Sequence, residues 1–252
     1  MPSLNRDGVN LHYEIHGEGP AILLSHGYSA TSQMWRGQIE ALSASHRLIV
    51  WDMRGHGRSD YPEEVSAYSE EATVADMAAL LDVAGADRAI VGGLSLGGYM
   101  SLAFHRVHPE RVRALLIVDT GPGFKNDGAR ERWNQRSLEY ASRLEAEGLG
   151  YLHSLSPEMA MSSHRSADGL LRAARGMLTQ RDDRVIRSLA DIRVPSLIVV
   201  GANDTPFLAA ADYMAAKIPN AAKVVIPNAS HSSNIDQPEL FNRAVLQFLE
   251  TV

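Results

Sequence analysis

Short apolar runs alternate with longer amphipathic segments along most of this 252-residue sequence. The apolar runs fall at residues 21–24, 48–51, 89–91, 114–118, 197–200 and 224–226. Runs this short and this uniformly apolar are typical of strands buried on both faces of a parallel sheet. Segments 72–83, 96–107 and 238–249 lie between or after them and carry apolar residues at helical spacing. The alternation predicts an α/β fold, a mostly parallel sheet with helices on both faces.

The first strand pattern is of a different kind. Apolar and polar residues alternate over 11–16, which predicts a strand with one buried and one solvated face. The Asp7-Gly8 turn is expected to pair this strand with residues near Leu4. His12 and His16 then lie together on the solvated face, where we expect surface side chains rather than metal ligands.

One long segment interrupts the alternation of apolar runs and helical segments. Residues 122–191 contain no apolar run and are charged and helical, as in Arg130-Glu131-Arg132-Trp133. The segment lies between two core strands, and open α/β sheets bind ligands at the carboxyl ends of their strands. We therefore expect a core of residues 1–121 and 192–252 with 122–191 inserted as a helical cap. The alternative is an ordinary crossover helix with long loops.

Composition excludes several classes of function. The chain has no cysteine, which excludes disulfides, thiolate metal sites and cysteine nucleophiles. Its net charge is -6 without a block of Lys or Arg, so a nucleic-acid partner is not expected. Residues 1–8 lack the pattern of a secretion signal, and the apolar runs are too short to span a membrane. We expect a cytoplasmic protein without a membrane partner, and the oligomeric state stays open.

The motif that carries chemistry is Gly93-Leu94-Ser95-Leu96-Gly97, which matches G-x-S-x-G. It follows the expected strand at 89–91 and opens the expected helix at Leu96, as a nucleophile elbow does. Such an elbow holds its serine at a strained positive φ, and the flanking glycines avoid clashes because they lack Cβ atoms. The motif predicts Ser95 as a nucleophile. The alternative is an ordinary glycine-rich turn.

A serine hydroxyl is a weak nucleophile until a base removes its proton. His231 follows the strand at 224–226 and precedes the last helix, so it is expected on a loop at the same sheet edge. His56, in a glycine-rich loop, is the remaining rival for this role. His105 and His108 end a helix, and we expect them there as charge partners of its carboxyl terminus.

The base in turn needs a carboxylate that fixes its tautomer and stabilises the imidazolium. Asp204 follows the strand at 197–200, in Gly201-Ala202-Asn203-Asp204, and gives the chain order Ser, Asp, His found in α/β-hydrolases. Asp119, which ends the preceding core strand, is the rival. Asp204 is favoured as the acid, although Asn-Asp is also a common turn sequence.

Two preorganised N–H donors should complete the site as an oxyanion hole. The N–H of Leu96, directly after the nucleophile, is expected to be one of them. The other is expected from Tyr28, in the loop Ser25-His26-Gly27-Tyr28 after the strand at 21–24. This chemistry needs no metal and no cofactor.

Large apolar side chains in the cap and core are expected to form the substrate pocket. The candidates are Tyr28, Leu96, Trp133, Tyr140, Met159, Met161, Met177 and Phe207. Each could equally be plain core. No Arg or Lys is required by the pattern to face a substrate carboxylate, although the cap arginines leave that open. We therefore expect a small or medium uncharged ester as the substrate.

At the level of motifs, the chain resembles α/β-hydrolases of the compact, capped esterase- and lyase-like group. The resemblance is carried by Ser25-His26-Gly27-Tyr28, Asp52-Met53-Arg54-Gly55-His56-Gly57-Arg58-Ser59, Gly93-Leu94-Ser95-Leu96-Gly97-Gly98, Gly201-Ala202-Asn203-Asp204 and Ala229-Ser230-His231. It covers nearly the whole chain. It implies the α/β-hydrolase fold, a Ser95–His231–Asp204 triad and acyl transfer through an acyl-enzyme.

The resemblance does not select the substrate. The group includes carboxylesterases, lactonases, carbon–carbon bond hydrolases, cofactor-free haloperoxidases and receptors with slow turnover. Ser230 stands where many relatives have Gly before the base, and Ser95 argues against dehalogenases and epoxide hydrolases, which use Asp. The loop 52–59 is interpreted as structural, with Asp52 and Arg54 tying it to the sheet.

Overall fold

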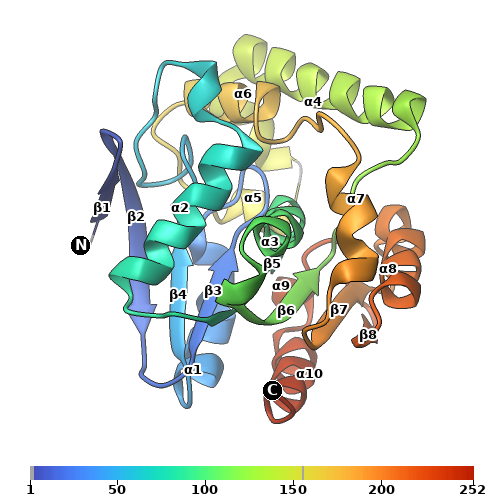
Figure 1. Cartoon of the computed structure of the whole chain (residues 1–252). Coiled ribbons are helices and arrows are strands. Elements are labelled where there is room, and N and C mark those ends of the chain that lie inside the picture. The colour runs from blue at the N-terminus through green and yellow to red at the C-terminus, as the bar shows by residue number, and fades with distance from the viewer. Residues whose placement is uncertain (1–2, 155) are drawn as a thin grey trace.

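The computed structural model describes residues 3–154 and 156–252, and its core is one twisted eight-stranded sheet. The strands are β1 (Ser3–Arg6), β2 (Val9–His16), β3 (Ala21–Ser25), β4 (Arg47–Trp51), β5 (Ala89–Leu94), β6 (Val112–Val118), β7 (Ser196–Gly201) and β8 (Ala221–Ile226). Their spatial order is β1-β2-β4-β3-β5-β6-β7-β8. Figure 1 shows the sheet with its helices.

The sheet is parallel from β4 to β8 and antiparallel only where β1 and β2 join it. This confirms the mostly parallel sheet predicted from the apolar runs. The expected hairpin is also present, because Leu4 pairs with Leu11 across an antiparallel register. Asp7 and Gly8 both have positive φ, as a tight two-residue hairpin turn requires.

Helices cover both faces of the sheet (Figure 1). They are α1 (Arg36–Ser43), α2 (Glu70–Val83), α3 (Leu96–Val107), α4 (Asp127–Glu147), α5 (Pro157–Ala160), α6 (Ala167–Arg175), α7 (Arg184–Ser188), α8 (Thr205–Lys217), α9 (Ser233–Asp236) and α10 (Pro238–Leu249). Along β3, Ile22 and Leu24 pack in the cluster that includes α1 and α10. Leu23 packs in the cluster that includes α2 and α3, so both faces of this strand are buried.

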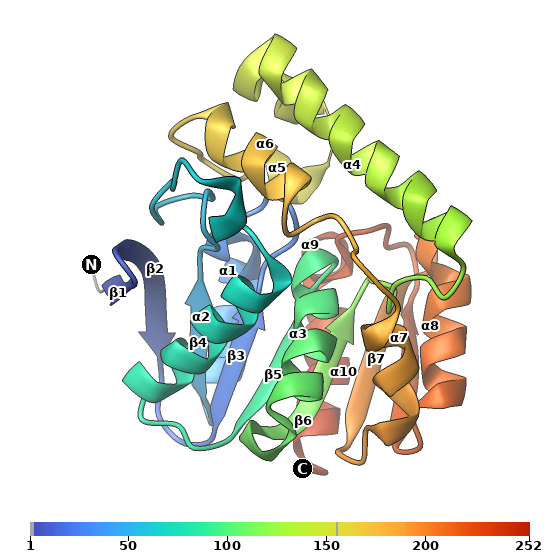
Figure 2. The same cartoon turned by 45° about the horizontal axis from the view of Figure 1, so that its top comes forward.

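The segment between β6 and β7 lies largely over one edge of the sheet. Figure 2 shows α4 and α6 above the carboxyl ends of the parallel strands, whereas α7 returns along the side of the sheet and packs against α3. A direct tie joins this segment to the core, because the Tyr28 hydroxyl donates a hydrogen bond to the Leu170 carbonyl of α6 at 3.0 Å. α4 and α6 therefore cover the carboxyl edge of the sheet.

Two strands differ from their predicted burial. β8 was expected to be buried on both faces, but it is the last strand of the sheet and Val225 is 42% exposed. In β2, His12 is only 4% exposed while Ile15 is 38% exposed, so the predicted solvated face of this strand is wrong at His12. The loop after β4 covers that end of β2, where the His12 N–H donates to Ser59 Oγ at 2.8 Å.

The loop 52–59 is held by hydrogen bonds, but Asp52 and Arg54 act separately. The Asp52 carboxylate accepts the N–H groups of Ser32 and Arg58 at 2.7 and 2.9 Å. Arg54 instead pairs with Asp76 of α2, at 2.6 and 2.8 Å. The loop is therefore fixed both to the chain after β3 and to a helix on one face of the sheet.

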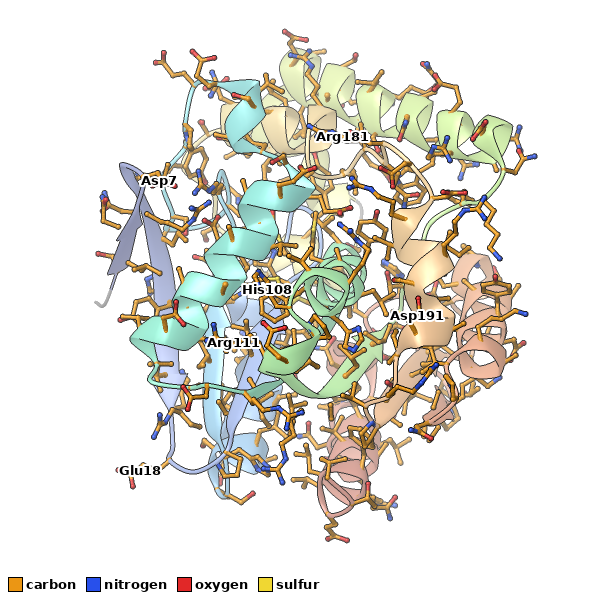
Figure 3. All side chains as sticks on the ribbon, in the orientation of Figure 1. Asp7, Glu18, His108, Arg111, Arg181 and Asp191 are labelled. Atoms are coloured by element: carbon orange, nitrogen blue, oxygen red, sulfur yellow. The ribbon has the colours of Figure 1, made fainter. Side chains whose placement is uncertain are left out.

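Charged side chains project from many elements around the surface, among them Asp7, Glu18, Arg181 and Asp191 (Figure 3). His105 does not belong with them: it is buried, and burial lowers its pKa, which favours the neutral ring. The predicted charge partnership with the end of α3 is therefore wrong for this histidine. Within the described residues, no helix combines the length and apolarity needed to cross a bilayer.

Candidate active site

Ser95 occupies the sharp turn between β5 and α3. Its φ is 54° and its ψ is -114°, a strained conformation for a residue with a side chain, as the motif predicted. Its N–H donates to the Val118 carbonyl at 2.9 Å, and its carbonyl accepts the Thr120 hydroxyl at 2.6 Å. Both backbone groups are thus tied to β6 and the loop after it, which holds the strained turn in place.

The flanking glycines permit this turn because the chain passes very close to them. A Cβ on Gly93 would lie 2.5 Å from the Ser25 carbonyl oxygen, and one on Gly97 would lie 2.2 Å from the same atom. Carbon and oxygen cannot approach so closely without displacing backbone. The two glycines therefore bring the elbow against the loop after β3, where the second oxyanion donor was expected.

His231 and Asp204 meet at the ends of two neighbouring strands. His231 Nδ1 lies 2.9 Å from Asp204 Oδ2, so a ring protonated at Nδ1 donates to this carboxylate and leaves Nε2 free to accept. Phe207, one turn into α8 from Asp204, stacks on the His231 ring with centroids 5.0 Å apart. The hydrogen bond and the stacked ring together fix the orientation of the imidazole.

Asp119, the rival acid, is occupied elsewhere. Its carboxylate accepts the Gly201 N–H at 2.8 Å, the Ser233 N–H at 3.0 Å and the Ser233 hydroxyl at 2.5 Å. Burial raises the pKa of Asp119 to about 7 against these hydrogen bonds. This side chain joins the end of β6 to β7 and α9, and the histidine hydrogen bond belongs to Asp204.

The charges around His231 decide its protonation. Burial disfavours the imidazolium, but the hydrogen bond and charge of Asp204 oppose it, and the charges of Asp119 and Glu158 add to them. The net effect raises the pKa of His231 above its ordinary value. An imidazolium that forms during a reaction is thereby stabilised.

The two predicted oxyanion donors are on either side of the elbow. Leu96 is the first residue of α3, and the first N–H groups of a helix have no partner within it. Tyr28 lies in the loop after β3 that packs against Gly97. Among the hydrogen bonds of the described residues, none uses the N–H of Leu96 or of Tyr28. Both donors therefore remain available to a ligand.

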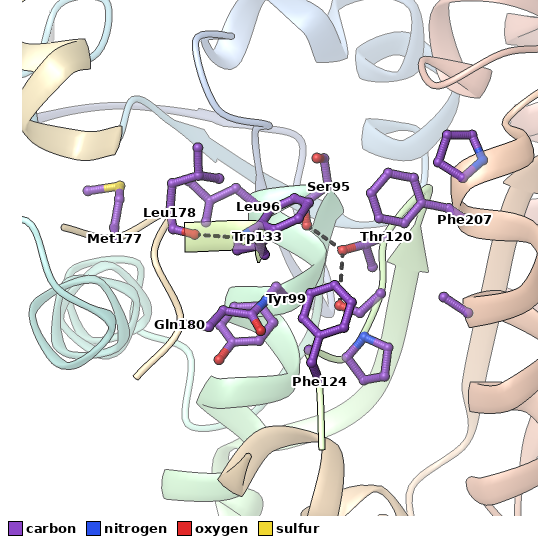
Figure 4. Close-up of a pocket in the computed structure, with 15 residues that line it drawn as sticks. Ser95, Leu96, Tyr99, Thr120, Phe124, Trp133, Met177, Leu178, Gln180 and Phe207 are labelled. Carbon is purple, nitrogen blue, oxygen red and sulfur yellow. Dashed lines mark hydrogen bonds between the residues drawn. The ribbon is translucent and has the colours of Figure 1, made fainter. Parts of the chain in front are cut away.

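Two adjoining cavities open at Ser95, between the sheet edge and the helices above it. The larger, about 390 Å³, is the His231 lobe, whose walls include Tyr28, Tyr140, Glu158, Met159, Asp204 and His231. The smaller, about 110 Å³, is the Tyr99 lobe, whose walls include Leu96, Tyr99, Phe124, Met177, Gln180 and Ala210 (Figure 4). Both lobes are also lined by Ser95, Trp133, Leu178, Pro206 and Phe207.

Most of the apolar side chains expected at the pocket do line one of the lobes, and Met161 is the exception. Apart from an arginine of the segment 122–191, which the sequence left open, the polar lining was not foreseen. Glu158, Arg136 and Ser156 line the His231 lobe, and Gln180 lines the Tyr99 lobe. These residues lie singly in the segment between β6 and β7 and belong to no motif, so nothing in the sequence marks them.

His56, the rival base, belongs to a cluster with His26, which is buried like His56 itself, and His164, which is half-buried. The ring centroids of His26 and His56 are 4.9 Å apart, and those of His56 and His164 are 5.9 Å apart. His56 Nε2 accepts the Ser29 N–H at 3.2 Å, and Nδ1 donates to the Arg54 carbonyl at 2.9 Å. Both ring nitrogens of His56 are therefore used by backbone, and it is not free to act as a base.

His26 and His164 are bound in the same way. His26 accepts the Met53 N–H at 2.9 Å, and His164 accepts the Gly57 N–H at 3.1 Å. Burial lowers the pKa of all three histidines, to about 4 for His26. The cluster is therefore neutral. Among the described residues, no group of three or more His, Asp or Glu side chains is placed to hold a metal ion.

Comparison with known proteins places this geometry in a family. The model of the alpha/beta hydrolase family matches residues 22–244. Full-length relatives include a putative carbamate hydrolase RutD of Azorhizobium caulinodans, 31% identical over 98% of both chains, and 3-oxoadipate enol-lactonase 1 of Acinetobacter baylyi, 29% identical over 98% of this chain and 96% of that one. A thermophilic esterase from Thermogutta terrifontis superposes with a TM-score of 0.82 at 30% identity, covering 99% of this chain and 96% of that one. The chain belongs to the alpha/beta hydrolase family.

Proposed function

We propose that this protein is a serine hydrolase that cleaves small to medium carboxylic esters through an acyl-enzyme on Ser95. One observation carries the proposal. The strained serine and the hydrogen-bonded His231–Asp204 pair line the same cavity, beside two N–H groups without partners. Nucleophile, base, acid and oxyanion donors are the complete set that acyl transfer requires.

In the first step, the Ser95 hydroxyl attacks the ester carbonyl while His231 Nε2 takes its proton. The carbonyl oxygen becomes an oxyanion, which the N–H groups of Leu96 and Tyr28 stabilise. The N-terminus of α3 adds its positive dipole end at the same place. Asp204 holds the imidazole and stabilises its charged form, in keeping with the raised pKa of His231.

In the second step, His231 returns the proton to the leaving alkoxide, and the ester C–O bond breaks. Water then attacks the acyl-enzyme with the same roles reversed, and the free acid and Ser95 are regenerated. No hydrogen bond links Ser95 Oγ to His231 among the described residues, and such catalytic contacts often tighten only once substrate is bound.

The segment 122–191 has the role of a cap in this proposal, with 1–121 and 192–252 as the catalytic core. The Trp133 indole and the Tyr140 ring of α4 line the His231 lobe from above, so the cap supplies walls for the substrate. The cytoplasmic location predicted from the sequence belongs to the same proposal, and cell fractionation tests it.

The decisive experiment compares the protein with Ser95→Ala on p-nitrophenyl acetate and butyrate. We expect multiple turnovers from the unchanged protein and a loss on the order of 10⁴-fold or more in the variant, because the nucleophile is removed. Equal release of nitrophenol from both proteins would exclude Ser95 as the nucleophile.

A lactone is the second candidate substrate, favoured by the similarity to an enol-lactonase. A lactone is an internal ester, so the same residues would open it and release no alcohol fragment. Five- and six-membered lactones assayed beside the p-nitrophenyl esters separate the two classes by their kcat/KM values. A single stoichiometric burst of nitrophenol, followed by near silence on every ester and lactone, would instead indicate a ligand-binding protein with slow turnover.

A further inference from the structure

The Tyr99 lobe contains a polar group that no part of the chain satisfies. Gln180 is 8% exposed, and its Oε1 atom is buried without a hydrogen-bond partner among the described residues. A buried carbonyl oxygen without a donor is unfavourable, because it has lost its hydration and gained no hydrogen bond in exchange. Native proteins rarely keep such a group except where a ligand or water completes it.

The neighbouring polar side chains of this lobe are already paired. The Tyr99 hydroxyl donates to Glu70 at 2.9 Å, and the Thr120 hydroxyl donates to the Ser95 carbonyl. Figure 4 shows Gln180 beside Tyr99, with the Thr120 hydrogen bonds drawn. Among the described side chains that line this lobe, Gln180 thus carries the buried polar atom that has no hydrogen-bond partner.

Gln180 is also held firmly in position. Asn134 of α4 accepts the Gln180 N–H at 2.8 Å and donates to the Gln180 carbonyl at 3.0 Å. The Trp133 indole donates to the carbonyl of Leu178 at 2.8 Å, two residues earlier. The cap helix therefore fixes the backbone on both sides of the carboxamide and leaves only its side chain for a ligand.

Gly123 makes room for this carboxamide. Its φ is +92°, and a Cβ there would lie 2.9 Å from Gln180 Oε1. Any other residue at this position would be strained and would crowd the oxygen. The missing side chain at Gly123 thus leaves the space that Gln180 Oε1 occupies in the wall of the Tyr99 lobe.

The position of the base decides which part of an ester enters this lobe. His231 must reach the leaving oxygen to protonate it, and His231 lines the His231 lobe and not the Tyr99 lobe. The alcohol portion therefore lies on the side of the His231 lobe. The acyl chain is directed into the Tyr99 lobe, whose volume of about 110 Å³ suits a short chain.

We propose that Gln180 selects esters whose short acyl chain carries a hydrogen-bond donor, a hydroxyl or an amide N–H, that pairs with its carboxamide oxygen. The inference rests on the proposed ester hydrolysis at Ser95 and names its substrate class. The rest of the chain should be apolar, because Leu96, Phe124 and Met177 form the surrounding wall.

Two methyl esters of matched shape test this inference. Methyl succinamate and methyl levulinate carry a second carbonyl at the same chain position and differ only in NH₂ against CH₃. Titration of the released acid should give a kcat/KM for the succinamate about ten- to a hundredfold above that for the levulinate, because only the succinamate supplies the missing donor. The pair methyl 3-hydroxybutanoate and methyl 3-methylbutanoate extends the test to a hydroxyl.

In Gln180→Met, which keeps the length of the side chain and removes the acceptor, the preference should fall close to one. The ratio is measured within each protein, so a general loss of activity cancels. Gln135→Met is the matched control, because Gln135 is exposed on α4, where its side chain donates to Glu131. It should keep the full preference.

Equal kcat/KM values within both pairs, or hydrolysis of none of these esters, overturns the inference. So does a preference that Gln180→Met leaves unchanged. The proposed function fails separately, if Ser95→Ala still hydrolyses p-nitrophenyl acetate as fast as the unchanged protein.

Discussion

His231 and the cluster of His26, His56 and His164 both lie close to the carboxyl edge of the sheet, but their surroundings shift the pKa of the ring in opposite directions. His231 faces a cavity and is surrounded by carboxylates, and the pKa of its ring is raised. His26, His56 and His164 are packed against one another and against backbone, and the pKa of each ring is lowered. The same side chain is prepared to gain a proton in one place and prevented from gaining one in the other.

The difference follows from the partners of the ring nitrogens. His231 Nδ1 meets a carboxylate oxygen, which favours a charged ring. In the cluster, one nitrogen of each ring accepts a backbone N–H, so protonation there would set two donors against each other. The surroundings of His231 suit a base that cycles through its charged form. Those of the cluster suit neutral rings that hold the loops after β3 and β4 together with the segment 122–191.

Removal of the Asp204 carboxylate should have the largest effect, because it takes away the partner that distinguishes His231 from the histidines of the cluster. In Asp204→Asn the geometry is retained, but the amide no longer stabilises the imidazolium, and it favours the wrong tautomer of His231. We expect kcat to fall by about 10⁴-fold. Steady-state hydrolysis of p-nitrophenyl acetate measures it.

Asp212→Asn is the matched control for that variant. Asp212 lies on α8, which begins directly after Asp204, and it is exposed and pairs with Lys223. Its kcat should stay within twofold of the unchanged protein. A similar kcat in both variants would show that the hydrogen bond to His231 is not used in catalysis.

The histidine cluster should make the fold sensitive to acid. A group whose pKa is lower in the folded than in the unfolded chain stabilises the fold above its unfolded value and loses that contribution as pH falls. For His26, burial lowers the pKa from 6.5 to about 4, so this contribution is lost as the pH falls through that range. Urea unfolding at several pH values between 7.5 and 4.5 measures the slope of this loss.

His164→Gln sharpens that test. His164 belongs to the cap segment and bonds Ser29 and Gly57 of the core loops. Glutamine can both accept and donate but does not titrate, so the variant should lose less stability on acidification than the unchanged protein. His108→Gln removes a partly exposed histidine and should leave the pH slope unchanged. If both variants behave alike, the cluster is not the source of the acid sensitivity.

The sequence allowed the positions of Ser95, Asp204 and His231 to be predicted far better than the histidine cluster. Ser95 stands in a motif whose glycines have a steric reason, and Asp204 and His231 follow strands that end at one edge. His164 bonds loops of the core from the segment 122–191, and Gln180 is held by Asn134 of α4, and only the folded chain brings these residues together. His12 was misjudged for the same reason, since a loop remote in sequence covers its strand.

A smaller test concerns Glu158, which reaches the His231 lobe from α5. Its carboxylate accepts the Ser232 hydroxyl, next to the base, and its charge contributes to the raised pKa of His231. His231 must be neutral to accept a proton, so kcat/KM should rise with pH through an apparent pKa above 6.5. Glu158→Gln keeps an acceptor for Ser232 and removes the charge. The acid limb should therefore shift downward by roughly a few tenths of a pH unit, as expected for one partly screened charge.

Glu145→Gln is the control for the loss of one negative charge. Glu145 is exposed on α4 and pairs with Arg175, apart from both lobes, so its acid limb should coincide with that of the unchanged protein. A shift in Glu158→Gln alone means that the cap carries part of the electrostatic environment of the base. Coincident profiles for all three proteins mean that Asp204 and Asp119 set the pKa of His231 without the cap, and that Glu158 acts only as a tie to the loop of the base.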